Sequence, residues 1–142
     1  MSVEENKTLI RRYVEAWNRG DLQALSEFWS RELVHHTRSN THGYEDTKRI
    51  VAAFMSQFPD MRFRLDDIIA EEDKVVSRMT WSATHKPDHP EGPKTGRPIT
   101  CTVIGIARLA GGRIAEHWGV TDELSMMAQM GLLPEEFLTA MA

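Results

Sequence analysis

The sequence predicts an α+β domain, in which a curved, mixed or antiparallel sheet is covered on one face by helices. Two changes in the spacing of apolar residues indicate this class. The chain begins with helical spacing, and from Arg62 onward apolar and polar residues alternate with the period of a strand. After Thr121 the helical spacing returns. Helices, then a run of strands, then a helical tail is an order in which the helices pack together on one face of the sheet.

Two helices are expected first. Ser2 and Glu5 form an S-x-x-E capping box, which predicts a helix start, and Gly20 is a suitable stop. Between these residues an apolar stripe recurs at helical spacing: Leu9, Ile10, Tyr13, Val14 and Trp17. Asp21 can then cap a second, short helix. The apolar residues expected on that helix are Leu22, Leu25, Phe28 and Trp29.

A short strand, a polar loop and a third helix follow. The segment ELVHHT (Glu32 to Thr37) is typical of a strand, and RSNTHG is expected to be the loop. The helix is expected from Tyr44 to Phe58, because its apolar residues fall on one face: Ile50, Val51, Phe54, Met55 and Phe58. A helix rarely continues through the residue before a proline, so the sequence FPD ends it.

Four strands are expected in the second half of the chain. Their predicted bounds are Arg62–Glu71, Val75–Lys86, Ile99–Ala110 and Arg113–Thr121. The turn EEDK joins the first two, and a loop dense in proline and glycine (Pro87–Pro98) joins the next two. Gly111 and Gly112 make a tight hairpin. A helix from Asp122 to Met130 follows, and Pro134 opens a last short helix.

Length and composition narrow the class of protein. A chain of 142 residues has the usual size of one domain, so we expect a single domain over residues 1–142. The net charge is −4 and no block of Lys and Arg is present, which argues against nucleic acid as a partner. No apolar run approaches the length that spans a bilayer, so no membrane partner is expected either.

The expected location is the cytoplasm. Cys101 is the only cysteine, so no disulfide can form within the chain, and that fits a reducing compartment. The first residues, MSVEENKTLIRRYVEAW, form an acidic amphipathic stretch. They lack the basic and then apolar order of a signal peptide.

No metal site is expected. His85 and His89 have H-x3-H spacing, but Pro87 and Pro90 prevent them from sharing a helix. His35, His36 and His42 also lie close in sequence, without an accompanying carboxylate or cysteine set. The sequence also lacks a Gly-rich phosphate loop and the patterns of a serine or cysteine nucleophile.

Strand parity predicts which side chains face the helices. On the strand that begins at Val75, the apolar face carries Val75, Ser77, Met79, Trp81, Ala83 and His85. On the last strand, Ile114, Trp118 and Val120 share a face that Asp122 continues, and His117 points to the opposite face. This assignment assumes that the strand has no bulge, because a single bulge would exchange the two sets.

Asp122 is the principal catalytic candidate on this reasoning. An apolar site disfavours the charged carboxylate and raises its pKa, which makes it a better general base. Trp81 and Trp118 are expected to supply flat apolar walls, and His85 or His36 a hydrogen bond to an enolate oxygen. Three further side chains are candidates for the lining: Tyr13, Trp17 and Met79. The alternatives are core packing for the aromatic residues and a helix N-cap for Asp122, and a cap and a catalytic role can coexist.

Several stretches together resemble the SnoaL-like polyketide cyclases, within the nuclear-transport-factor-two-like or cystatin-like superfamily. They are RRYVEAWNRGDLQALSEFW, QFPDMRF, EEDKVVSRMTWSATH and TGRPITCTVIGIARLAGGRIAEHWGVTDELSMMAQMGLLP. The resemblance covers nearly the whole chain. It implies a cone-shaped α+β fold with a deep pocket between the helices and a strongly curved sheet. It also implies a homodimer built on the outer face of the sheet.

The resemblance further implies a reaction. Characterised members close a ring of an aromatic polyketide by an intramolecular aldol step, with an aspartate as acid and base and no metal or cofactor. Asp122 matches that aspartate, His36 matches a family histidine after the second helix, and Thr84 with His85 matches a threonine–histidine pair. The loop KPDHPEGPKTG and the absence of histidine from Gly105 to Arg108 depart from the family pattern.

Three functions follow as expectations. The first is a cofactor-independent cyclase, or a related isomerase or lyase, for a hydrophobic, carbonyl-rich small molecule, with Asp122 as acid and base. The second is a hydratase or hydrolase in which the carboxylate activates water. The third is a non-catalytic, dimeric protein that binds a small molecule. The same fold can support all three, so the direction of the Asp122 side chain is the observation expected to separate them.

Overall fold

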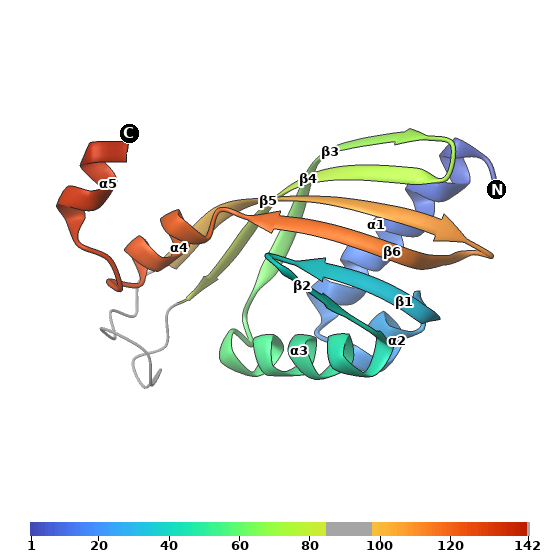
Figure 1. Cartoon of the computed structure of the whole chain (residues 1–142), viewed down its shortest axis with the longest axis horizontal. Coiled ribbons are helices and arrows are strands. Elements are labelled where there is room, and N and C mark those ends of the chain that lie inside the picture. Colours follow the sequence, from blue (N-terminus) through green and yellow to red (C-terminus); the bar gives the residue numbers. More distant parts are fainter. Residues whose placement is uncertain (85–97, 142) are drawn as a thin grey trace.

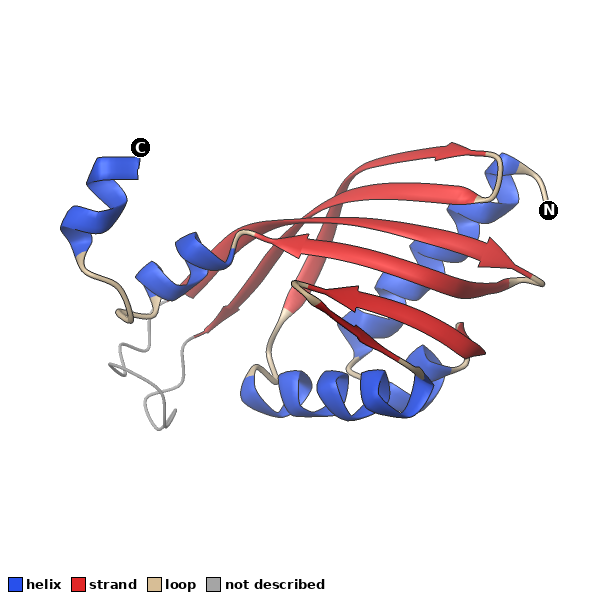
Figure 2. Cartoon of the chain, in the orientation of Figure 1, coloured by secondary structure: helices blue, strands red, loops and turns tan. Residues whose placement is uncertain are grey.

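The computed structural model of the chain describes residues 1–84 and 98–141. Over these residues the chain forms five helices and one six-stranded sheet, coloured by type in Figure 2. The helices are α1 (Val3–Arg19), α2 (Leu22–Ser26), α3 (Tyr44–Gln57), α4 (Glu123–Gln129) and α5 (Glu135–Met141). The strands are β1 (Trp29–Thr37), β2 (Asn40–His42), β3 (Arg62–Glu71), β4 (Lys74–Thr84), β5 (Pro98–Ala110) and β6 (Arg113–Thr121).

The predicted α+β class is confirmed. The strand order is β2-β1-β6-β5-β4-β3, and all neighbours are antiparallel except β1 and β6, which are parallel. The sheet is therefore mixed, and it bends strongly along its length (Figure 1). Helices α1 and α3 lie against its hollow side, whereas α4 and α5 extend beyond the end of β6 (Figure 1).

The helix boundaries follow the capping signals of the sequence. The Ser2 Oγ accepts a hydrogen bond from the Glu5 N–H at 3.1 Å, and Gly20 ends α1 in the left-handed region at φ 65°. The Asp21 carboxylate accepts from the Ala24 N–H at 3.1 Å and starts α2. Helix α3 ends at Gln57, one residue earlier than expected.

The polar segment after β1 is not a simple loop. Residues Asn40–His42 form β2, which pairs antiparallel with β1, so that His35 lies opposite His42. Arg38 occupies the turn between them with φ 46°, an uncommon conformation for a residue other than glycine. β1 itself begins at Trp29, three residues earlier than expected, because Trp29 pairs with Ile114 and only 3% of its surface is exposed.

The apolar face of β4 meets the helices as predicted. Val75, Ser77, Trp81 and Ala83 are buried. Trp81 packs in a core cluster with Phe58 and its indole N–H donates to the Met61 sulfur at 3.4 Å. His85, the last residue expected on this face, lies outside the described residues, as does most of the Pro87–Pro98 segment.

A bulge in β6 overturns the predicted parity of that strand. Arg108 pairs with Glu116 and Leu109 pairs with Ile114. Ala115 therefore has no partner of its own on β5 and is the extra residue of the bulge. Beyond the bulge the strand is turned over by one residue. His117, Gly119 and Thr121 therefore face the helices together with Ile114, whereas Trp118 and Val120 have the outward parity. Val120 is 73% exposed, although part of it also lines the pocket.

Candidate active site

A pocket of about 920 Å³ lies between the helices and the hollow face of the sheet. Its wall is formed by residues of α1, α3, α4 and all six strands, and most of these side chains are apolar or aromatic. Tyr13 and Trp17 of α1 and Met79 of β4, the sequence candidates for the lining, are among them. The Tyr13 hydroxyl accepts a hydrogen bond from the Trp29 indole N–H at 2.9 Å, which fixes the ring in the wall.

The floor of the pocket is hollow because one row of the sheet has small side chains. Gly119 pairs with Gly105, and Gly105 pairs with Ser77, across β6, β5 and β4. On one side of this row lie His35 and His117, paired across β1 and β6. Side chains project from the sheet at every second residue, so a row of two glycines and a serine leaves space that larger residues would fill.

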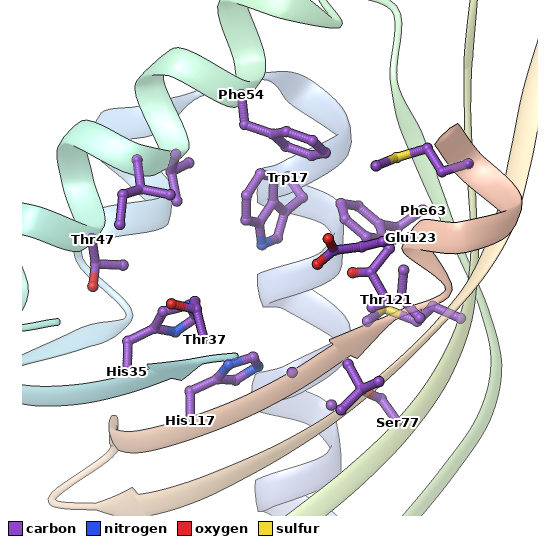
Figure 3. Close-up of a pocket in the computed structure, with 18 of the residues that line it drawn as sticks. Trp17, His35, Thr37, Thr47, Phe54, Phe63, Ser77, His117, Thr121 and Glu123 are labelled. Carbon is purple, nitrogen blue, oxygen red and sulfur yellow. The ribbon is translucent and has the colours of Figure 1, made fainter. Parts of the chain in front are cut away.

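The His35 and His117 rings stack in the pocket with their centroids 5.1 Å apart and their planes 10° apart (Figure 3). The His117 ring also lies across the glycine row. A Cβ atom on Gly105 would be 3.2 Å from His117 Nε2, and one on Gly119 would be 3.3 Å from His117 Cε1. Both glycines are thus needed for the position of this ring.

Both histidines are neutral at pH 7. Burial, assisted by the nearby His42 and His36, lowers the pKa of His35 to about 4. Burial, assisted by His35 and His36, lowers the pKa of His117 to about 3. The His117 Nδ1 is buried and has no hydrogen-bond partner among the described residues. The pocket thus holds two uncharged imidazoles in an apolar wall.

Asp122 does not point into the pocket, so its predicted orientation is wrong. The side chain is exposed, and its carboxylate accepts the Ser125 N–H at 3.2 Å as the N-cap of α4. The β6 bulge is the physical reason, since it gives the inward direction to Thr121 instead. Of the two alternatives weighed from the sequence, the structure shows the cap.

The carboxylate that lines the pocket belongs to the next residue, Glu123. It lies at the start of α4 and points toward the pocket interior (Figure 3). Arg38, from the turn between β1 and β2, donates to it through Nε at 3.3 Å and through Nη2. Of the Arg38 side chain 76% is exposed, so this ion pair lies at the mouth of the pocket.

His36 and Trp118 lie on the other side of the sheet, contrary to expectation. Their rings stack with centroids 5.0 Å apart and planes 3° apart. The His36 Nε2 is 2.7 Å from a Glu116 carboxylate oxygen, and Arg108 donates to the same carboxylate at 3.2 Å. Neither His36 nor Trp118 lines the pocket, and Trp81 is a core residue behind it.

The described residues offer neither a reactive cysteine nor a metal site. Burial, with Asp122 and Glu123 nearby, raises the pKa of Cys101 to about 11, so its thiol stays protonated at neutral pH. Among residues 1–84 and 98–141, no group of three or more His, Cys, Asp or Glu side chains is arranged to hold a metal ion. In the same residues no helix is long and apolar enough to cross a membrane.

Two features of the sequence could have predicted that His35 and His117 lie in the pocket. Leu33 has the parity of His35, and an inward-facing leucine on β1 places His35 in the pocket and His36 outside. Glycines inside the strands at positions 105 and 119 indicate a close approach by another group. That group is the His117 ring.

Known proteins with a similar structure share this architecture. AclR from Streptomyces galilaeus, a candidate hydroxylase, is 32% identical with a TM-score of 0.86, over 94% of this chain and 100% of its own. IdmH from Streptomyces antibioticus, a candidate polyketide cyclase, is 30% identical with a TM-score of 0.80, over 89% of this chain and 98% of its own. TsrD from Streptomyces laurentii is 28% identical with a TM-score of 0.81, over 94% of this chain and 99% of its own. A search of curated proteins gave no match.

The sequence itself matches a family model over most of its length. The model is that of the SnoaL-like polyketide cyclases, and residues 7–130 match it. This range runs from α1 through the last residue before Gly131 and includes every strand of the sheet. The chain therefore belongs to the SnoaL-like polyketide cyclase family.

Proposed function

We propose that this chain catalyses a cofactor-independent acid/base reaction, such as an intramolecular aldol cyclisation, on a hydrophobic, carbonyl-rich small molecule. The observation that supports it most directly is the pocket of about 920 Å³, whose wall is largely apolar but holds a few polar side chains. A pocket of this volume suits a ligand of several fused or folded rings. The family match points to the same substrate class.

The proposed reaction needs one base and a folded substrate. A carbon between two carbonyl groups is acidic enough for a carboxylate to remove its proton. The enolate then attacks a second carbonyl of the same molecule, and the carboxylic acid returns the proton to the new alkoxide. Confinement accounts for much of the rate, because the pocket restricts the substrate before the bond forms.

We assign the role of base to Glu123, since its carboxylate lines the pocket. The ion pair with Arg38 must open for this role, and exposed pairs of this kind contribute little to stability, so opening is easy. Asp122, which matches the family aspartate, is the alternative base. It would have to release the Ser125 N–H and turn into the pocket, at the expense of the α4 cap.

The second candidate function is a non-catalytic protein that binds a small molecule. The observation in its favour is Asp122 itself, whose carboxylate serves the helix and faces solvent. Such a protein would retain the pocket and the ligand class. It would not require a carboxylate within reach of the ligand.

Deuterium uptake by a simple 1,3-diketone separates these functions. Benzoylacetone in D₂O would be followed by NMR at its central carbon, with wild-type protein, Glu123→Gln and Asp122→Asn. We expect the wild type to accelerate exchange, Glu123→Gln to lose about 100-fold or more, and Asp122→Asn to stay near wild type. The reverse order would make Asp122 the base. Binding without acceleration by the wild type would favour the non-catalytic function.

We also propose that the chain forms a homodimer through the outer face of the sheet. There, a row of largely apolar residues crosses five strands in register: His36, Trp118, Ile106, Val76 and Ile69. Val120 and Ile104 extend it and are 73% and 46% exposed. An apolar row that continues over several strands and is half-buried to exposed is typical of an interface. Light scattering should report a dimer, and Val120→Glu should shift it to monomer; a wild-type monomer would contradict the proposal.

A further inference from the structure

His117 and His35 are the two histidines that line the pocket, and their rings make no hydrogen bond among the described residues. By contrast, His36 and His42 each have a side-chain partner: His36 pairs with Glu116, and His42 Nε2 lies 3.0 Å from the Thr37 hydroxyl. Of the four nitrogens of these two rings, only His117 Nδ1 is fully buried without a partner among the described residues. Polar groups are normally satisfied, so the nitrogens that reach the pocket are the ones a ligand can satisfy.

The residues around His35 and His117 keep both rings in the wall of the pocket and keep them uncharged. Across the sheet, His35, His117, Ala107 and Val75 are paired in one row, so the neighbours on this side are small or aliphatic. The carboxylate of Glu116 is engaged on the outer face, and that of Glu123 is engaged by Arg38 at the mouth. Among the described residues no ion pair reaches His35 or His117, which agrees with their lowered pKa values.

The burial of one nitrogen determines which edge of His117 can reach a ligand. A neutral imidazole carries its proton on one nitrogen and a lone pair on the other. His117 Nδ1 is buried without a partner, and a proton there would be a donor that nothing accepts. The favourable arrangement has the lone pair on Nδ1 and the proton on Nε2, the nitrogen beside the open glycine row.

We infer that the stacked His35–His117 pair is the polar anchor of the pocket, with His117 Nε2–H donating a hydrogen bond to a carbonyl or enolate oxygen of the ligand. This inference rests on the proposed function for the ligand class and adds the atom that recognises it. A neutral imidazole is well suited to the task, because it polarises a carbonyl without giving up its proton. His35 stacks on the ring, and the missing side chains of Gly105 and Gly119 leave the space that the ring occupies.

A matched pair of probes tests the anchor. 2-Acetylnaphthalene and 2-isopropenylnaphthalene have nearly the same shape, and only the first has a carbonyl oxygen. Their Kd values would be measured by calorimetry with wild type, His117→Phe and Thr47→Val. Phe keeps an aromatic ring beside His35, and Thr47 supplies a control because its buried hydroxyl also lines the pocket without a partner.

The test compares the ratio of the two Kd values, ketone to alkene, between the variants and the wild type. We expect His117→Phe to shift the ratio about fivefold to tenfold against the carbonyl compound, and Thr47→Val to leave it near the wild-type value. An unchanged ratio in His117→Phe, or a shift caused by Thr47→Val instead, would overturn the anchor and leave the proposed function standing. Failure of the wild type to bind either naphthalene would overturn both.

A measurement on the wild type alone covers the case in which His117→Phe does not fold. Long-range ¹H–¹⁵N spectra of protein with labelled histidine report which ring nitrogen carries the proton. We expect His117 to carry it on Nε2 at pH 7 and to shift on addition of 2-acetylnaphthalene but much less with the alkene. A proton on Nδ1, a charged ring, or equal shifts with both probes would overturn the inference.

Discussion

The two faces of the sheet treat the same kind of residue in opposite ways. His35 and His36 are neighbours in β1, and His117 and Trp118 are neighbours in β6. Each pair across the strands stacks, with ring centroids 5.1 Å apart in the pocket and 5.0 Å apart on the outer face. In the outer stack His36 Nε2 is bound by Glu116, whereas within residues 1–84 and 98–141 no hydrogen bond reaches the rings of the pocket stack.

This difference shows that burial and partners decide the chemistry of these rings, and residue type does not. The outer histidine shares the Glu116 carboxylate with Arg108, and hydrogen bonds from His36 and Arg108 lower the pKa of Glu116. The pocket histidines are buried and form no ion pair with the part of the chain that the structure describes, so their charged forms are disfavoured. The pocket face thus presents neutral imidazoles, and the outer face holds the Glu116–Arg108 ion pair.

Acid should destabilise the protein first through the pocket face. Folding lowers the pKa of His117 from 6.5 to about 3, so the unfolded chain binds more protons below pH 6.5 and stability falls as the pH drops. The loss from His117 is about 2 kcal/mol between pH 7 and pH 5. Urea unfolding across this range should show it, and His117→Phe should flatten the curve. A wild-type stability that is level from pH 7 to pH 5 would contradict the lowered pKa values.

The glycine row should be intolerant of a single methyl group. Gly105→Ala places a Cβ 3.2 Å from His117 Nε2, and we expect about 1–2 kcal/mol of destabilisation. The matched control is the same change in a His117→Ala background, where the space is free and the cost should largely vanish. Urea midpoints of the four proteins give the coupling. Equal costs in both backgrounds would show that the ring does not depend on the glycine.

Loss of the α4 cap should have a moderate effect on stability. Asp122→Ala removes the acceptor of the Ser125 N–H, and such losses are about 1 kcal/mol. Asp122→Asn should be almost neutral, because asparagine caps equally well. Chemical denaturation measures both. A cost for Asn as large as that for Ala would mean that the negative charge, and not the cap, is what the site needs.

The smallest effect is expected on the outer face, and at lower pH. Hydrogen bonding lowers the pKa of Glu116 from 4.5, so its contribution is present above pH 4.5 and is lost as the pH falls through the folded-state value. Glu116→Gln should therefore weaken the protein slightly at pH 7 and reduce the acid loss only below pH 4.5. The same urea series tests this. A change of slope between pH 6.5 and pH 5 in this variant would erase the distinction between the two faces.

The helices and most strands could be predicted because their signals are local. Ser2, Asp21 and Gly20 act on backbone groups a few residues away, and the alternation in β4 continues without interruption. β2 was missed because three polar residues carry no apolar pattern, and only the partner strand β1 makes them a strand. The predicted orientation of Asp122 was wrong because one bulged residue, Ala115, exchanges the faces of the side chains that follow it in β6.

By itself the sequence determined the α+β class, the family and the capping residues, since spacing, composition and local hydrogen bonds are written along the chain. Only the tertiary structure decided which of these side chains lie together and which face of the sheet each one occupies. It brought His35 beside His117 from strands far apart in sequence, placed Glu123 at the pocket and left Asp122 outside. The reason is physical: side chains alternate with a period of two along a strand, so a pairing register and a single bulge choose the face, and neither is encoded within the strand alone.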